Sequence, residues 1–235
     1  DGSGSVLFLQ MVDESLQVHG MDLHTNGGGF AVRIEQSDGF ELSDSMITGS
    51  PGISIENSHL RLLRVDLVND NSGTGIFVHG VPSAGTTIED CDVDGYETAL
   101  SLEGGLNDIE GQGVTIFESH LHATVSIDSN TLPFTLSGGE IDGEIRLRGP
   151  DKTWAANIID YDYFMTNITG SARLLSSHSW TVQGLAGLNL TMTIPEFDVV
   201  IGEQSLSWNS PTNLLILHEV YTSDGKLEAS IAQWS

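Results

Sequence analysis

An eight-residue pattern that recurs along most of the chain limits what this sequence can fold into. Apolar residues stand at positions one and six, a small or apolar residue at position four, and mostly polar residues at positions five and seven. The copy from Ile88 to Gly95 shows the pattern most clearly. The eight copies begin at Val18, Leu42, Leu62, Ile88, Ile116, Leu136, Trp154 and Leu175, at separations of 24, 20, 26, 28, 20, 18 and 21 residues. A period in this range is typical of a solenoid.

A second element, an apolar-polar-apolar triplet, stands ahead of most copies of the pattern. Its copies are Val32–Ile34, Ile53–Ile55, Ile76–Val78, Leu100–Leu102, Val125–Ile127 and Ile145–Leu147. Alternation with period two predicts a strand with one buried face. Each repeat therefore has two short strands separated by turns rich in Gly, Asn, Asp and Ser. We expect coils of parallel strands stacked on one another, and the crossover rule makes them right-handed.

With these two elements the chain resembles the right-handed parallel β-helix, or pectin-lyase-like, superfamily over residues 5–185. The resemblance implies an all-β fold. The eight copies of the pattern predict about eight coils in residues 1–185, with a length of roughly 35–40 Å from the inter-strand spacing. The resemblance implies no single activity, because the superfamily includes lyases, hydrolases, epimerases, phage tailspikes and surface adhesins. Residues 186–235 lose the repeat and predict a hairpin at Thr222–Gly225. We expect this segment to be a β-rich C-terminal cap or the start of a following β domain.

The net charge of the chain limits the classes of partner that it can bind. With 33 acidic and 8 basic residues, the formal charge is −25. Such a surface repels nucleic acid and anionic membranes, and it fits a salty setting such as a halophilic or marine source. No apolar run is long enough to span a membrane, so we expect no membrane insertion by this segment. Asn167 and Asn189 begin glycosylation sequons, which matter only in a secreted protein.

Cys91 is the only cysteine, so the chain forms no internal disulfide. It stands at position four of its copy, where other copies have Ser45, Ser119 and Gly139. This position predicts a small buried residue, which we favour over a reactive thiol.

Positions five and seven of the pattern predict one candidate site. Both positions point outward, and neighbouring coils lie about 4.8 Å apart while alternate residues on a strand lie about 6.6 Å apart. Three consecutive copies bring titratable side chains to these positions. We predict that they form one continuous patch, the Asp/His patch, made of Asp92, Asp94, His120, His122, Glu140 and Asp142.

Three interpretations of the Asp/His patch remain open. It is a solvated face of an acidic protein, a divalent-cation site for calcium or zinc, or a pair of acid and base groups acting on a glycosidic bond. Arg146 and Arg148, which could neutralise an acidic substrate, are expected on another face, which weakens the case for a lyase. The motifs Gly-x-Ser-x-Gly, His-Glu-x-x-His, Gly-x-x-x-x-Gly-Lys and paired Cys-x-x-Cys are absent.

These observations favour a non-catalytic domain of an extracellular or cell-surface protein. We expect it to act as a stalk, an adhesin or a glycan-binding module, with a glycan or a cell-surface molecule as partner and without a required cofactor. The alternative is a polysaccharide hydrolase or lyase that uses the Asp/His patch.

Overall fold

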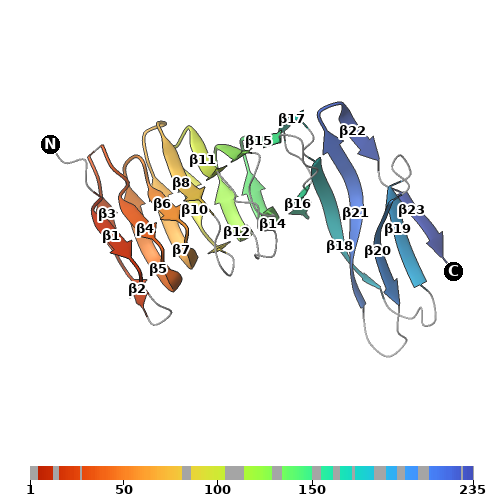
Figure 1. The fold of residues 1–235 in the computed structure, drawn as a ribbon, viewed down its shortest axis with the longest axis horizontal. Coiled ribbons are helices and arrows are strands. Elements are labelled where there is room, and N and C mark those ends of the chain that lie inside the picture. The colour runs from red at the N-terminus through yellow and green to blue at the C-terminus, as the bar shows by residue number, and fades with distance from the viewer. Residues whose placement is uncertain are drawn as a thin grey trace.

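The computed structural model describes residues 5–12, 16–26, 28–80, 86–103, 114–128, 134–149, 155–160, 165–170, 173–182, 189–194, 199–205, 212–228 and 230–234. Within these ranges every regular element is a β-strand. The strands form a parallel β-solenoid of about five turns, which confirms the predicted parallel β-helix architecture (Figure 1). No helix in the described residues is long and apolar enough to cross a membrane.

One wall of the solenoid is an eight-stranded sheet, here called sheet A. All its neighbouring strands pair in parallel, and the predicted apolar-polar-apolar triplets lie in it. In spatial order its strands are β1 (Leu7–Gln10), β4 (Val32–Glu35), β6 (Ile53–Glu56), β8 (Thr74–His79), β11 (Thr98–Glu103), β13 (Thr124–Asp128), β15 (Glu144–Gly149) and β17 (Met165–Gly170).

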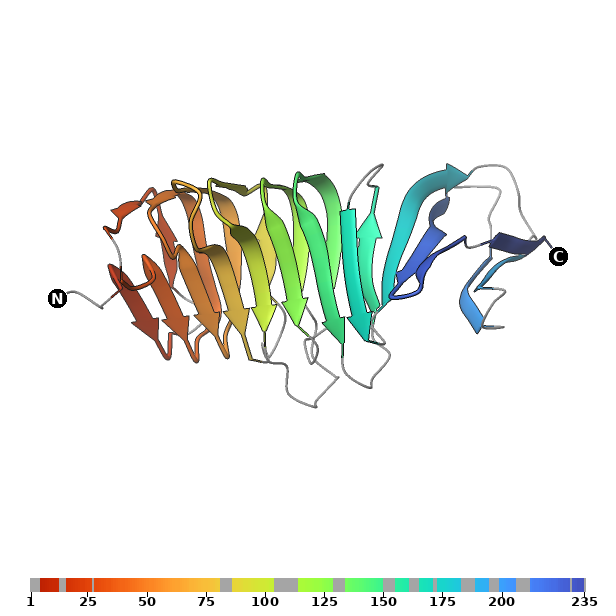
Figure 2. The same cartoon turned by 90° about the horizontal axis from the view of Figure 1, so that it is seen from above.

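The second wall, here called sheet B, holds the eight-residue pattern. Figure 2 shows the parallel strands of the solenoid stacked side by side from red to cyan. The parallel strands of sheet B are β2 (Gln17–His19), β3 (Asp22–His24), β5 (Asp38–Thr48), β7 (His59–Val68), β9 (Thr87–Glu89), β10 (Asp92–Asp94), β12 (Val114–Leu121), β14 (Phe134–Ile141), β16 (Ala155–Ile159) and β18 (Arg173–Val182).

The first six copies of the pattern stack in register, so each position forms a column along the solenoid. Position one reads Val18, Leu42, Leu62, Ile88, Ile116 and Leu136. The last two copies were aligned wrongly from the sequence, because Leu136 pairs with Ile158 and not with Trp154. Ile158 in turn pairs with Ser176 and not with Leu175.

The cause of this misalignment is a backbone corner at position three. Residues there have positive φ: Gly20, Asp44, Arg64, Asp90, Glu118, Gly138 and Asp160. Asp160 lies two residues after Ile158, as position three must, so the corner sets the register of the seventh copy. Apolar spacing alone cannot distinguish Trp154 from Ile158 as a starting point.

Apolar columns fill the space between the two sheets. At position six, Ile47, Leu67 and Val93 are 0% exposed, and Leu121 and Ile141 follow at 1% and 6%. Each of these side chains packs on its counterpart in the next coil because the register is conserved from strand to strand. Removing this area from water contributes about 25 cal/mol per Å² to stability.

At position four, Ser45 and Ser119 form hydrogen bonds between coils through their hydroxyl groups. The Ser119 hydroxyl accepts a hydrogen bond from the Cys91 N–H at 3.1 Å and donates to the Phe117 carbonyl at 3.0 Å. Ser45 repeats this arrangement with the Met21 N–H. Cys91 is 3% exposed, and burial raises the pKa of its thiol to about 12. The prediction of a small buried residue at position 91 is confirmed.

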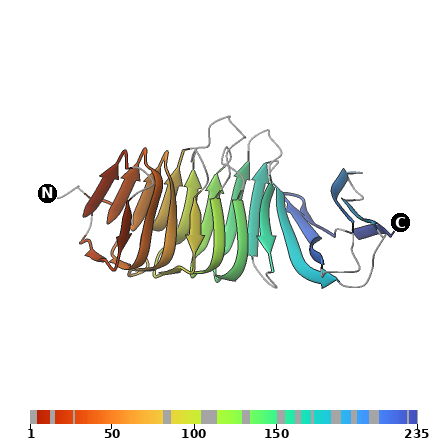
Figure 3. The same cartoon turned by 90° about the horizontal axis from the view of Figure 1, so that it is seen from below.

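The pairing changes from parallel to antiparallel after β18. This strand pairs with β21 (Thr212–Thr222), which forms the predicted hairpin with β22 (Gly225–Glu228). A separate antiparallel sheet contains β19 (Asn189–Ile194), β20 (Val199–Ser205) and β23 (Ser230–Trp234). These strands lie at the C-terminal end of the parallel stack (Figure 3). Two insertions interrupt the repeat in the sequence, at Val81–Gly85 and Glu103–Gly113, and apart from Glu103 they lie outside the described residues.

Candidate functional site

The Asp/His patch lies on the outer face of sheet B across three consecutive coils. In register, Asp92 on β10 pairs with His120 on β12, and His120 pairs with Glu140 on β14. His122 and Asp142 follow directly after β12 and β14. Their amide groups continue the ladder, since the His122 N–H donates to the Val93 carbonyl at 3.0 Å and the Asp142 N–H donates to the Leu121 carbonyl at 3.1 Å.

His122 is the centre of this group. Its Nδ1 lies 2.6 Å from an Asp142 carboxylate oxygen, and its Nε2 lies 3.4 Å from an Asp92 oxygen. The hydrogen bond with Asp142 raises the pKa of His122, and the charges of Asp92, Asp142 and Asp94 act in the same direction against the effect of partial burial. One imidazole therefore links side chains from three coils, a diagonal contact that column positions alone do not predict.

Three of the patch residues present ligand atoms to one point. One atom each from Asp92, His120 and His122 lies within 4.8 Å of the others. The two imidazole rings are 6.0 Å apart and nearly perpendicular, at 83°. A tetrahedral zinc ion with bonds of about 2.0–2.1 Å needs the three atoms somewhat closer together. Asp92 and His120 are exposed, so small side-chain rotations are open to them.

Asp142 gives His122 the orientation that a metal ligand needs. A ligating imidazole usually donates its other N–H to a carboxylate, which fixes its tautomer and its direction. When the Nδ1–H of His122 donates a hydrogen bond to Asp142, the lone pair of Nε2 faces Asp92 and His120. The arrangement supports two states, a protonated His122 between two carboxylates or a neutral His122 that ligates a cation.

Asp94 and Glu140 are outside this group of three ligands. Both side chains are exposed, and Asp94 acts on His122 through its charge alone. The predicted patch of six therefore has a linked part, made of Asp92, His120, His122 and Asp142, and two flanking carboxylates.

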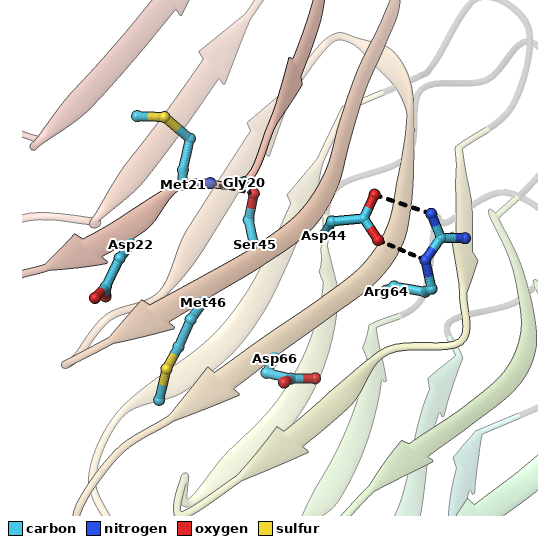
Figure 4. Close-up of a pocket in the computed structure, with 8 residues that line it drawn as sticks. All are labelled: Gly20, Met21, Asp22, Asp44, Ser45, Met46, Arg64 and Asp66. Atoms are coloured by element: carbon cyan, nitrogen blue, oxygen red, sulfur yellow. Dashed lines mark hydrogen bonds and ion pairs between the residues drawn. The ribbon is translucent and has the colours of Figure 1, made fainter.

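A hollow with a volume of about 360 Å³ lies farther along the outer face of sheet B, and it was not predicted from the sequence (Figure 4). Its lining residues are Gly20, Met21, Asp22, Asp44, Ser45, Met46, Arg64 and Asp66. Asp22, Met46 and Asp66 belong to the position-five column that continues into Asp92. Met46 is 45% exposed and lies between two acidic residues. An apolar residue in this otherwise polar column was the signal in the sequence that could have indicated the hollow.

Asp44 and Arg64, which stand at the position-three corner, line one side of this hollow. Arg64 donates two hydrogen bonds to Asp44, at 2.6 and 2.9 Å, and this pairing lowers the pKa of the Asp44 carboxyl. Because both residues have positive φ, they project outward from the bend and not along the strand.

The other residues noted in the sequence lie elsewhere. Arg146 and Arg148 are on β15 of sheet A, so the expectation that they face away from the Asp/His patch is confirmed. Asn167 is exposed on β17. Asn189 begins β19, and its side chain lies outside the described part of the structure.

Comparison of the chain with protein-family models, with curated proteins and with solved structures finds no match. Inferences about function therefore depend on the geometry described above.

Proposed function

We propose that this protein is a non-catalytic domain of an extracellular or cell-surface protein, which serves as a stalk, an adhesin or a glycan-binding module. The observation that carries the proposal is the unbroken position-five column on sheet B. It runs through Asp22, Met46, Asp66, Asp92, His120 and Glu140. A rigid ladder of this kind holds mostly polar outward side chains at a regular spacing of about 4.8 Å, which suits recognition of an extended partner.

The chemistry of the patch supports binding over catalysis. His122 already contacts a carboxylate through each ring nitrogen. The patch also lies outside the hollow lined by Asp22, Met46 and Asp66, and outside a second hollow, on sheet A, lined by Arg146, Arg148, Asn167 and Thr169. A glycosidase needs two carboxyl groups that flank the scissile bond of a bound sugar.

The proposal includes the finer architecture. We infer about eight right-handed coils in residues 1–185, followed by residues 186–235 as a cap or as the start of a further β domain. The antiparallel pairing of β18 with β21 supports a cap, because it covers an edge that would otherwise offer unpaired backbone groups. A chain ending at residue 185 should then self-associate in light scattering, and a monomer as stable as the full chain would contradict the cap.

We also propose that calcium or zinc binds at Asp92, His120 and His122, with Asp142 orienting His122. Binding to the native state would raise the melting temperature by mass action. Micromolar zinc should raise it in the parent and have no effect in His120→Ala/His122→Ala. Asp92→Asn/Asp94→Asn should weaken the response to zinc or to millimolar calcium. Sodium at matched ionic strength controls for screening, and an equal shift with sodium would reduce the patch to a solvated acidic face.

The expected partner is a glycan or another cell-surface molecule. The formal charge of −25 opposes nucleic acid and anionic membranes, and it supports a salty habitat in which ions screen the self-repulsion. The direct test is a screen of neutral and acidic polysaccharides for binding and for chain cleavage together. Binding without cleavage supports the proposal, and reproducible release of oligosaccharides would overturn it.

A second candidate, a polysaccharide hydrolase or lyase, is favoured by the short His122–Asp142 hydrogen bond. A carboxylate that raises the pKa of a histidine is an arrangement used for general acid catalysis. If cleavage is observed, His122→Ala should abolish it, whereas His120→Ala should retain more of it.

A further inference from the structure

We propose that a hollow on the outer face of sheet A binds an oxyanion, either a free ion such as sulfate or the charged group of a saccharide. The hollow has a volume of about 230 Å³, and its lining residues are Arg146, Arg148, Asn167 and Thr169. They stand on β15 and β17, in the sheet that does not contain the Asp/His patch.

The strand register places these four side chains in a compact rectangle. Arg146 pairs with Asn167, and Arg148 pairs with Thr169. Neighbouring strands lie about 4.8 Å apart, and alternate residues about 6.6 Å apart. Ile145 and Leu147, which alternate with the arginines along β15, point inward, since both are 0% exposed. Both arginines therefore face solvent on the same side as Asn167 and Thr169.

The lining chemistry selects an anion. All four side chains carry hydrogen-bond donors, and no carboxylate lines the hollow. The planar guanidinium fork matches two oxygens of a carboxylate or sulfate group. Among the described residues, the Thr169 hydroxyl makes one long hydrogen bond, of 3.4 Å, to the Leu147 carbonyl, which a ligand can replace. In a chain with 33 acidic and 8 basic residues, such a surface has the opposite sign to the average.

Arg148 differs from both Arg33 and Arg146 on the same sheet. Arg33 forms ion pairs with Glu35 and with Glu56, so its charge is neutralised by neighbours. In Arg146 the Nε group donates to Glu144 at 2.6 Å, which fixes the guanidinium group. Among the side chains that the structure describes, no carboxylate pairs with Arg148.

Arg148 has one register partner on each of the two adjacent coils. Its partner on the preceding coil is Asp128, and its partner on the following coil is Thr169, which carries no charge. Arg148 is therefore the residue expected to contribute most to anion binding.

The hollow also coincides with a glycosylation sequon. Asn167 and Thr169 are the first and third residues of Asn-Ile-Thr, and both line the hollow. A glycan attached to Asn167 would occupy the space in front of Arg146 and Arg148. Glycosylation and oxyanion binding at this place therefore exclude each other, and protein from a glycosylating host, once modified at Asn167, should bind no oxyanion here.

The test is a titration of unglycosylated protein with sodium sulfate, glucose 6-sulfate, glucuronate and glucose at constant ionic strength, followed by NMR chemical shifts or calorimetry. We expect sulfate and the two charged sugars to bind and glucose to be silent. Arg148→Gln should weaken binding about tenfold or more, because it removes charge-assisted hydrogen bonds. Thr169→Val should weaken it less, and Arg148→Lys should retain part of the affinity. Circular dichroism verifies the fold of each variant.

Arg33→Gln is the matched control, since it removes an arginine from the same sheet outside the hollow. It should leave the affinity unchanged. An equal loss in Arg33→Gln and Arg148→Gln would overturn the proposal by showing a long-range effect of net charge, and so would the absence of sulfate binding. The saccharide form of the inference rests on the proposed function. Sulfate binding without sugar binding would overturn that form alone, and the zinc response of the Asp/His patch reports separately on the proposed function.

Discussion

Two adjacent columns of sheet B differ by one residue along each strand and behave in opposite ways. Position six points inward and stacks Ile47, Leu67 and Val93 at 0% exposure. Position five points outward and places Asp66 directly opposite Asp92. The spacing is the same, about 4.8 Å. Stacking in register therefore repeats one interaction along the solenoid, which stabilises an apolar column and destabilises a column of like charges.

The outer column has features that relieve this repulsion. Met46 separates Asp22 from Asp66, and His120 separates Asp92 from Glu140. His122 adds a diagonal contact between Asp92 and Asp142. We therefore expect substitutions in the inner and outer columns to have different effects on the free energy of unfolding.

The largest difference is expected between two neighbours on β5. Ile47→Ala should lower the free energy of unfolding by about 2–5 kcal/mol, because it removes buried apolar atoms and leaves a cavity. Met46→Ala, one residue earlier and 45% exposed, should change it by about 0.5 kcal/mol or less. Urea unfolding of the two variants measures both effects. Similar losses for the two would contradict the assignment of inner and outer faces.

The second prediction concerns the slot at position four. Ser119→Ala should cost about 1–3 kcal/mol, because the buried Cys91 N–H loses its acceptor. Cys91→Ser is the control, since a serine hydroxyl fits the same slot and can donate to the Glu89 carbonyl as the thiol does. We expect its effect to be smaller than that of Ser119→Ala in the same unfolding assay. The reverse order would show that packing of the sulfur matters more than the hydrogen bond.

The contrast between inner and outer columns also explains what the sequence could predict. The first six copies were aligned correctly because each inward position is apolar or small, and period two fixes which side chains share a face. That alignment was enough to place Asp92, His120 and Glu140 next to one another.

Three features could not be predicted in this way. The corner at position three accepts Gly, Asp, Arg and Glu, so no residue type marks it, and the seventh copy was started at Trp154 and not at Ile158. The hollow around Met46 and the reach of His122 to Asp92 depend on side-chain directions, which a pattern of positions does not contain.

The third prediction uses the pH dependence of the outer column. Folding raises the pKa of His122 above its ordinary value of 6.5. The stability from its ion pairs is therefore fully present below pH 6.5 and is lost as the pH rises through the folded pKa. We expect a loss of about 0.5 kcal/mol, a typical value for a partly exposed pair. His122→Gln should remove this part of the pH dependence, whereas His120→Gln should retain it.

The smallest effect is expected from the like charges of Asp66 and Asp92. Asp66→Asn keeps the size of the side chain and removes one of two charges that face each other across β7 and β10. It should stabilise the protein by roughly 0.2–0.5 kcal/mol at low salt, because directly opposed like charges are destabilising. At about 1 M sodium chloride the Debye length is near 3 Å, so the gain should vanish. Ile47→Ala, in contrast, should cost at least as much at high salt as at low salt. If the gain in stability from Asp66→Asn does not depend on salt, it arises from hydrogen bonding and not from the loss of repulsion between Asp66 and Asp92.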